Sequence, residues 1–155
     1  MYSRIGAAGL SSGGGRQAYN IRGCINMDGL VNDALSKRVW AVVGATLRKD
    51  KFGYKIYKTL KDHGYSVYPV NPNCDEVDDD KCYPDLMSLP EIPQVVDMVI
   101  PPKDAEATIR QAASLGCGII WFQPGAESDE VISLSSGLGL KVVHHDCVMQ
   151  RLAGR

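Results

Sequence analysis

Small residues and cations gather in one segment of the chain, residues 44–53. It begins with Gly44, Ala45 and Thr46 and carries Arg48 and Lys51 a little further on. Small residues let a main chain approach a pyrophosphate closely, and a guanidinium can grip two phosphate oxygens at once. A segment of this kind between a strand and a helix predicts a phosphate-binding turn. Each of its three cations, Arg48, Lys49 and Lys51, could add a charged contact, with ordinary surface charge as the alternative.

Two other groups of residues could in principle do chemistry. His144, His145, Asp146 and Cys147 contain a nucleophile and bases, but neighbours on an extended segment point to opposite sides. We therefore expect a structural or solvent-exposed role for the histidine pair. The aspartates at 78–80 predict a solvated acidic turn, because no further carboxylates follow at the spacing of a calcium loop.

Composition excludes several classes of function. The chain has 155 residues, 45% of them hydrophobic, which is enough for one domain with a real core. Its 17 basic and 18 acidic residues nearly cancel, so neither nucleic acid nor an anionic membrane is an expected partner. No apolar run approaches the roughly 20 residues of a membrane helix, and we expect a cytoplasmic protein. The five cysteines show no C-x-x-C pair, which favours reduced thiols over disulfides or zinc.

Five short runs rich in β-branched residues alternate with helical stretches after residue 38. This pattern predicts an α/β fold, a Rossmann-like three-layer α/β/α domain with a five-stranded, mainly parallel sheet. The expected strands cover residues 39–43, 66–70, 95–100, 118–122 and 140–143. Residues 1–26, rich in glycine and serine, are expected to be a flexible extension, and residues 27–155 the domain, opening with a helix over 28–37.

The helices have recognisable ends. Gly64 and Gly116 suit the left-handed position after helices over residues 51–63 and 104–115, and Ser128 suits the N-cap of a third. The first helix is expected to bury Phe52, Ile56 and Leu60, and the third to pack Ile132, Leu134 and Leu138 on the sheet. Between the second and third strands we expect turns, with a short edge strand or one helical turn at 85–89.

The phosphate turn does not match a dinucleotide fingerprint. After Gly44 the next glycine is Gly53, so the G-x-G-x-x-G spacing is missing. An NAD enzyme would also place an acid at the end of the second strand, where this chain has Asn71. Both features weaken the prediction of an NAD site and leave room for another phosphate-bearing cofactor.

An ordered series of motifs runs through residues 38–152. The motifs are VVGAT (42–46), KFGYKIY (51–57), YPVNPN (68–73), CYPDL (82–86), LP (89–90), PP (101–102), WFQPGA (121–126) and HDCVM (145–149). Together they resemble the stand-alone CoA-binding domain proteins, relatives of the CoA-binding domain in the α subunit of succinyl-CoA synthetase.

The resemblance implies a set of ligand-binding residues along the edge of the sheet. In that family the first turn cradles the CoA phosphates, the end of the second strand flanks the adenine, and the segment after the third strand lines the nucleotide or pantetheine path. In this chain these are Gly44, Ala45, Thr46, Arg48 and Lys51, then Val70, Asn71 and Pro72, then Ile100, Pro101 and Pro102. Gln123 and Pro124 end the fourth strand at the same edge and are expected to join them. The two prolines could instead only begin a helix, and Trp121 is expected in the core.

The leading hypothesis is a non-catalytic protein that binds CoA or an acyl-CoA. The resemblance implies no catalytic residues and no metal in the chain, because the phosphorylated histidine of the synthetase belongs to a second domain. Two alternatives stay open, an oxidoreductase using NAD(P) and an interaction subunit with a vestigial nucleotide pocket. A protein partner or a second copy of the chain is compatible with each. A further hypothesis is a mixed disulfide between CoA and Cys117 or Cys147.

Overall fold

The computed structural model describes residues 26–155. They fall into two compact units, divided after Ser36, and each is described by itself. The described part of the first unit contains helix α1 (Met27–Ser36), which confirms the helix expected there and buries Leu30, Val31, Ala34 and Leu35. The extension expected over residues 1–26 lies outside the described residues except for the last of them.

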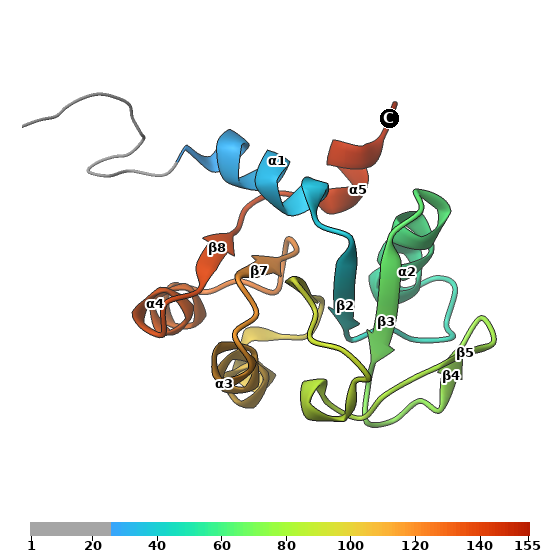
Figure 1. Ribbon diagram of the computed structural model, residues 1–155. Coiled ribbons are helices and arrows are strands. Elements are labelled where there is room, and N and C mark those ends of the chain that lie inside the picture. Colours follow the sequence, from blue (N-terminus) through green and yellow to red (C-terminus); the bar gives the residue numbers. More distant parts are fainter. Residues whose placement is uncertain (1–25) are drawn as a thin grey trace, which may run out of the picture. The chain divides into compact units, whose positions relative to one another are not determined.

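The second unit is built on a five-stranded sheet (Figure 1). All neighbouring strands are parallel, in the order β3-β2-β6-β7-β8. Because both faces are covered, the central strands are apolar along almost their whole length. The predicted α/β sheet is confirmed, although the third strand ends at Met98, two residues early. The strands are β2 (Val39–Val43), β3 (Ser66–Val70), β6 (Val95–Met98), β7 (Ile119–Phe122) and β8 (Lys141–Val143).

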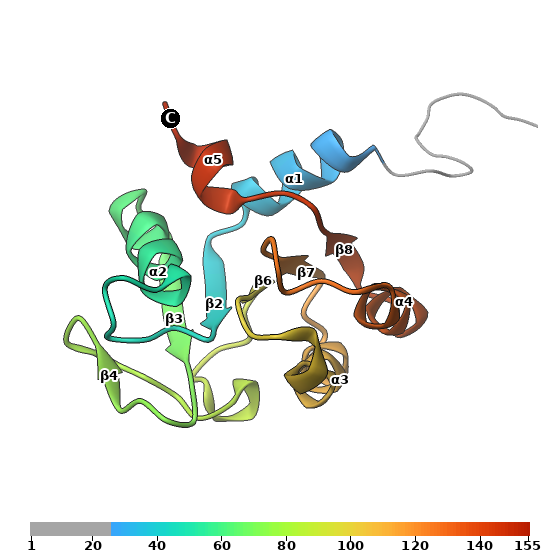
Figure 2. The same ribbon diagram turned by 180° about the vertical axis from the view of Figure 1, so that it is seen from behind.

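Helices cover both faces of this sheet (Figure 2). On one face Val96 and Met98 of β6 share a core with Ile109 and Val131 from two helices. The other face is covered by α2 and α5, which contact each other. This is the three-layer arrangement that the sequence predicts. The helices are α2 (Phe52–Asp62), α3 (Glu106–Leu115), α4 (Asp129–Gly137) and α5 (Val148–Leu152).

The N-cap of α4 is the one that the sequence predicts, but the face that this helix buries differs from the expected one. The Ser128 hydroxyl accepts a hydrogen bond from the Val131 amide at 3.3 Å, which confirms the N-cap. However, α4 buries Val131 and Ser135, whereas Leu138 is 38% exposed. Ile132 and Leu134 are only partly buried. The expected packing is therefore confirmed for Ile132 and Leu134, which pack against the core, and is wrong for Leu138. The i, i+4 row of α4 that faces the core most directly is that of Val131 and Ser135.

The segment between β3 and β6 has more structure than turns alone. It forms a hairpin whose two turn residues, Asp78 and Asp79, have φ values of 48° and 68°, as a type I′ turn requires. The Asp78 carboxylate accepts a hydrogen bond from Tyr54 at 2.9 Å, and Asp80 accepts one from Tyr57. The acidic turn is therefore tied to α2 rather than simply solvated. The remaining short elements are β4 (Glu76–Val77), β5 (Asp80–Lys81), and the 3-10 helices η1 (Leu86–Ser88) and η2 (Pro102–Asp104).

The helices of the described chain are short. None of those within residues 26–155 has the length and apolar character needed to span a membrane. The predicted helical turn at 85–89 is confirmed by η1, where the Asp85 carboxylate accepts a hydrogen bond from the Ser88 amide at 3.0 Å.

Candidate functional site

The strand order places a crevice between β2 and β6. The chain leaves β2 towards β3 on one side, and β6 begins the half of the sheet on the other side. Loops diverge at such a switch point, so ligands of doubly wound sheets bind outside the carboxyl ends of the strands there. The turn after Val43 and the segment after Met98 both begin at this place.

Gly44 lets these two segments pack closely. Its φ is 104°, and its amide donates a hydrogen bond to the Val70 carbonyl oxygen at 2.9 Å. A Cβ on Gly44 would lie 3.0 Å from the Ile100 Cγ2 atom and 3.2 Å from the Val99 carbonyl carbon. A side chain here would be strained in its backbone and crowded against the neighbouring segment.

Gly53 brings the start of α2 against the same turn. It is buried in the first turn of the helix, and a Cβ there would lie 2.0 Å from the Gly44 carbonyl oxygen. No side chain fits in this space, so the glycine allows backbone to touch backbone. As a result the N-terminal end of α2, where amides lack helical partners, lies at the phosphate turn that the sequence predicts.

Two of the three cations of the turn, Arg48 and Lys51, are well placed to meet an anion. Arg48 and Lys51 are both exposed, and Lys51 is the N-cap residue of α2 in an extended conformation. The Arg48 guanidinium lies 3.9 Å from the Asp50 carboxylate, a surface ion pair that holds it only weakly. The Lys51 amide donates to the Arg48 carbonyl oxygen at 3.0 Å, which closes the turn.

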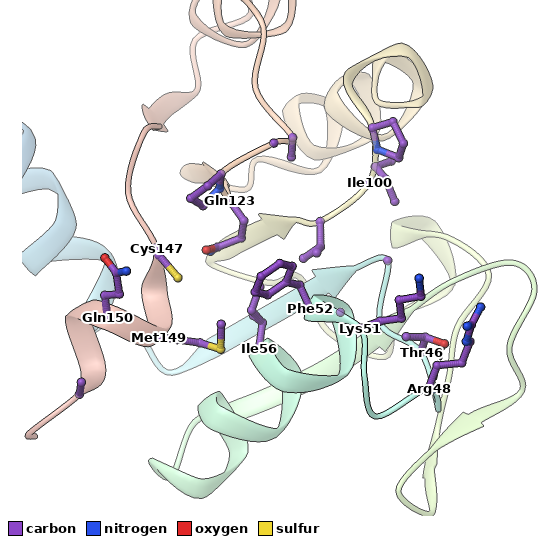
Figure 3. Close-up of a pocket in the computed structure, with 18 residues that line it drawn as sticks. Thr46, Arg48, Lys51, Phe52, Ile56, Ile100, Gln123, Cys147, Met149 and Gln150 are labelled. Atoms are coloured by element: carbon purple, nitrogen blue, oxygen red, sulfur yellow. Dashed lines mark hydrogen bonds between the residues drawn. The ribbon is translucent and has the colours of Figure 1, made fainter.

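A cavity of about 890 Å³ opens at this edge of the sheet (Figure 3). Its walls come from the β2–α2 turn, the start of α2, the ends of β6 and β7, and α5. The lining residues are Gly44, Thr46, Arg48, Lys51, Phe52, Gly53, Ile56, Val99, Ile100, Pro101, Gln123, Pro124, Gly125, Ala126, Cys147, Met149, Gln150 and Ala153. The volume falls in the range of small-molecule and cofactor sites.

Most of the predicted site residues meet at this cavity. Those that line it are Gly44, Thr46, Arg48, Lys51, Ile100, Pro101, Gln123 and Pro124.

The other five lie elsewhere. Ala45 and Val70 are buried in the core, and Pro72 is exposed. Pro102 begins η2, so of the two prolines one lines the cavity and the other starts a helix. Asn71 supports the turn, because its Nδ2 atom donates to the Ala45 carbonyl oxygen at 2.9 Å. A direct contact of these five with a ligand stays a prediction.

Phe52 is the clearest departure from the sequence prediction. We expect its ring to be buried with Ile56 and Leu60, but it is 62% exposed and lines the cavity. The helix begins at this residue, and its ring lies at the cavity rather than in the core. The periodicity of apolar residues does not reveal where a helix leaves the core.

Sequence reasoning also missed the wall that α5 supplies. Met149, Gln150 and Ala153 line the cavity, with Cys147 just before the helix. The only signal in the sequence is the motif around Cys147. The mixed-disulfide hypothesis stays a prediction for this thiol. Cys117 is buried outside the cavity, and burial raises the pKa of its thiol to about 11.

A buried polar chain joins the sheet to that wall. Gln123 is 2% exposed; its Nε2 atom donates to the Asp97 carboxyl at 2.7 Å, and its Oε1 atom accepts from the Val148 amide at 3.2 Å. Asp97 is fully buried, and burial raises its pKa to about 8. Its Oδ2 atom has no hydrogen-bond partner among the described residues. Burial thus favours the protonated form of this carboxyl.

The residues at 144–147 make separate contacts. The Nδ1 atoms of His144 and His145 lie 2.6 Å apart, so the rings contact each other although the two residues are adjacent. His145 has a φ of 57°, which departs from the extended segment assumed in the sequence analysis. Asp146 accepts a hydrogen bond from the Arg151 guanidinium at 2.7 Å. Trp121 is fully buried, as expected, and donates to the Asp146 carbonyl oxygen at 2.9 Å.

Comparison with known proteins agrees with this geometry. The model of a family described as the CoA binding domain matches residues 38–153. The α subunit of the ADP-forming acetate–CoA ligase II of Pyrococcus furiosus is 31% identical over 122 residues, which are 70% of this chain and 26% of that subunit. The chain thus spans about a quarter of that relative.

Two small solved structures match over nearly their whole length. A hypothetical protein from Pyrococcus horikoshii is 32% identical, with a TM-score of 0.77 over 84% of this chain and 94% of that one. A conserved hypothetical protein from Pyrococcus furiosus is 38% identical, with a TM-score of 0.70 over 74% and 98%.

Proposed function

The chain belongs to the family of the CoA binding domain, and from this premise we propose that its cavity binds CoA or an acyl-CoA without catalysing a reaction on it. The observation that carries the proposal is the contact between Gly53 and Gly44. It holds the N-terminal end of α2 against a turn from which two cations, Arg48 and Lys51, line the same cavity. Backbone amides and cations in this arrangement suit the phosphates of the cofactor.

The end of β3 favours CoA over NAD(P). The position where a dinucleotide enzyme places an acid for the ribose is held by Asn71, whose amide is already bonded to the turn. An oxidoreductase would therefore lack its usual ribose contact. The interaction subunit with a vestigial pocket remains the second alternative, and it predicts no affinity for any nucleotide.

Isothermal titration calorimetry with CoA, NAD, NADP and ATP separates these functions. We expect CoA to bind and NAD not to bind. Arg48→Ala and Lys51→Ala should each weaken CoA binding by about tenfold, since a lost charged hydrogen bond costs about 1.5 kcal/mol. Lys49→Ala is the matched control, because Lys49 lies between these residues and does not line the cavity. Binding of NAD alone, or of none of the four, would refute the proposal.

A further inference from the structure

The charged residues that line the cavity all lie on one side of it. Of the eighteen residues that line it, only Arg48 and Lys51 carry a charge. In Figure 3 both lie on the side of the β2–α2 turn, whereas Cys147, Met149 and Gln150 lie on the opposite side. A ligand anchored by its phosphates at the turn therefore extends its other end towards α5.

The side of the cavity at α5 has no charged residue and is mainly apolar, with Gln150 as its polar neighbour. We call it the apolar lobe and define it by Phe52 and Ile56 of α2 together with Cys147 and Met149, all of which line the cavity. Figure 3 shows Met149 facing Ile56 and Phe52 across the lobe. The Gln123 amide beside it is already held by the Asp97 carboxyl and the Val148 amide. The lobe thus supplies no cation to a ligand.

The exposure of Phe52 shows that the lobe presents apolar surface to water. At 62% exposure its ring is the most exposed of the large apolar side chains in the described part of the chain. An apolar group placed against it removes that surface from water at a gain of about 25 cal/mol per Å². Met149 is only partly buried, and a flexible thioether adapts to groups of different shape.

From these features we propose that the apolar lobe holds the acyl chain of a CoA thioester, and that this chain is apolar and carries no charge. The inference rests on the proposed function. A dicarboxylic acid would place its free carboxylate among Phe52, Ile56 and Met149. There the charge would lose water and gain no cation. The lobe therefore selects against such thioesters as well as for apolar ones.

A matched pair of ligands tests this selection. Butyryl-CoA and succinyl-CoA have acyl chains of equal carbon number that end in a methyl group and a carboxylate. In calorimetric titrations we expect butyryl-CoA to bind about tenfold tighter than acetyl-CoA, since each buried methylene strengthens binding by about fourfold. Succinyl-CoA should bind at least tenfold more weakly than butyryl-CoA.

Substitutions in the lobe provide the second arm. Met149→Arg supplies the missing cation and should reverse the preference, so that succinyl-CoA binds tighter than butyryl-CoA. Phe52→Ala should reduce the gain from acetyl-CoA to butyryl-CoA to less than half. Leu47→Ala is the control, because Leu47 is also an exposed apolar residue, at 54%, but does not line the cavity.

The outcomes distinguish the two proposals. If CoA binds but butyryl-CoA binds no tighter than acetyl-CoA, or succinyl-CoA is preferred by the unaltered chain, the acyl inference is overturned while the proposed function stands. If no CoA species binds, the proposed function itself fails. An unchanged preference in Met149→Arg would place the acyl chain outside the lobe and also overturn the inference.

Discussion

Asp97 is an acid held inside the sheet without a cation. It lies on β6 between Val96 and Met98, and its hydrogen-bond partner is the neutral amide of Gln123. The loss of water on burial disfavours the charged form. Because the folded pKa of about 8 lies above the usual value near 4, this group links stability to pH.

The direction of that linkage follows from proton counting. Between about pH 4 and pH 8 the unfolded chain has released this proton while the folded chain keeps it. The contribution of this group to the unfolding free energy is therefore fully present below pH 4. It falls as pH rises, by at most about 1.4 kcal/mol per pH unit, and levels off above pH 8.

Substitution of Asp97 by asparagine isolates this effect. In urea unfolding at pH 5, 6, 7 and 8 we expect the unfolding free energy of the unaltered chain to fall steadily relative to that of Asp97→Asn. The introduced carboxamide can still accept the hydrogen bond from Gln123, but it does not titrate in this range. The variant should be the less stable one at pH 5, because the new amide protons would be buried without partners. A difference that does not vary with pH would show that Asp97 is already ionised when folded.

At the scale of elements, the contact between α2 and the phosphate turn decides whether the site exists. Gly53→Ala adds a Cβ that meets the Gly44 carbonyl oxygen at 2.0 Å, so α2 must shift away from the turn. We expect a loss of about 1–3 kcal/mol in unfolding free energy. CoA affinity should fall as well, because the helix amides move from the phosphates.

Gly118→Ala is the matched control for this variant. No atom lies within 4 Å of the Cβ it would carry, and its φ is not positive. Urea unfolding and calorimetry on both variants separate close packing from the general effect of removing a glycine. If Gly53→Ala were as stable as Gly118→Ala and bound CoA normally, the proposed role of the α2–turn contact would be wrong.

Much of this architecture could be predicted from the sequence, because the residues that begin and end each element lie next to it in the chain. Strands such as Ser66–Val70 are bounded by turn residues, and Ser128 and Gly116 mark helix ends through their own side chain or φ. The β2–α2 turn was equally visible, since Gly44, Arg48 and Lys51 lie close together in the chain.

What could not be predicted depends on elements that are distant in sequence. The exposure of Phe52 depends on where α2 passes the edge of the sheet. The wall at Met149 depends on α5 returning to α2, across about 90 residues of chain. The sequence does not indicate that Asp97 pairs with Gln123, because a polar residue inside a strand does not reveal which distant residue is its hydrogen-bond partner. The β2–α2 turn that lines the cavity was thus predictable, and the apolar lobe was not.

At the scale of the whole molecule, the cavity exists only when the second unit is folded. Its lining residues run from Gly44 to Ala153 and come from the turn after β2, the ends of β6 and β7, and α5. Unfolding separates all of these segments at once. A ligand of the cavity must therefore stabilise the whole unit rather than one loop.

Thermal unfolding measures this coupling. At about 100 times its dissociation constant, CoA should add about 2.7 kcal/mol to the unfolding free energy, and each further tenfold in concentration about 1.4 kcal/mol more. For a unit of this size the first increment raises the midpoint by roughly 10 °C. Arg48→Ala should unfold at the same temperature as the unaltered chain without ligand, because its side chain is exposed, and should show a smaller shift at equal CoA concentration. A midpoint that stays constant while calorimetry records binding would mean that CoA binds the unfolded chain equally well, and hence not in this cavity.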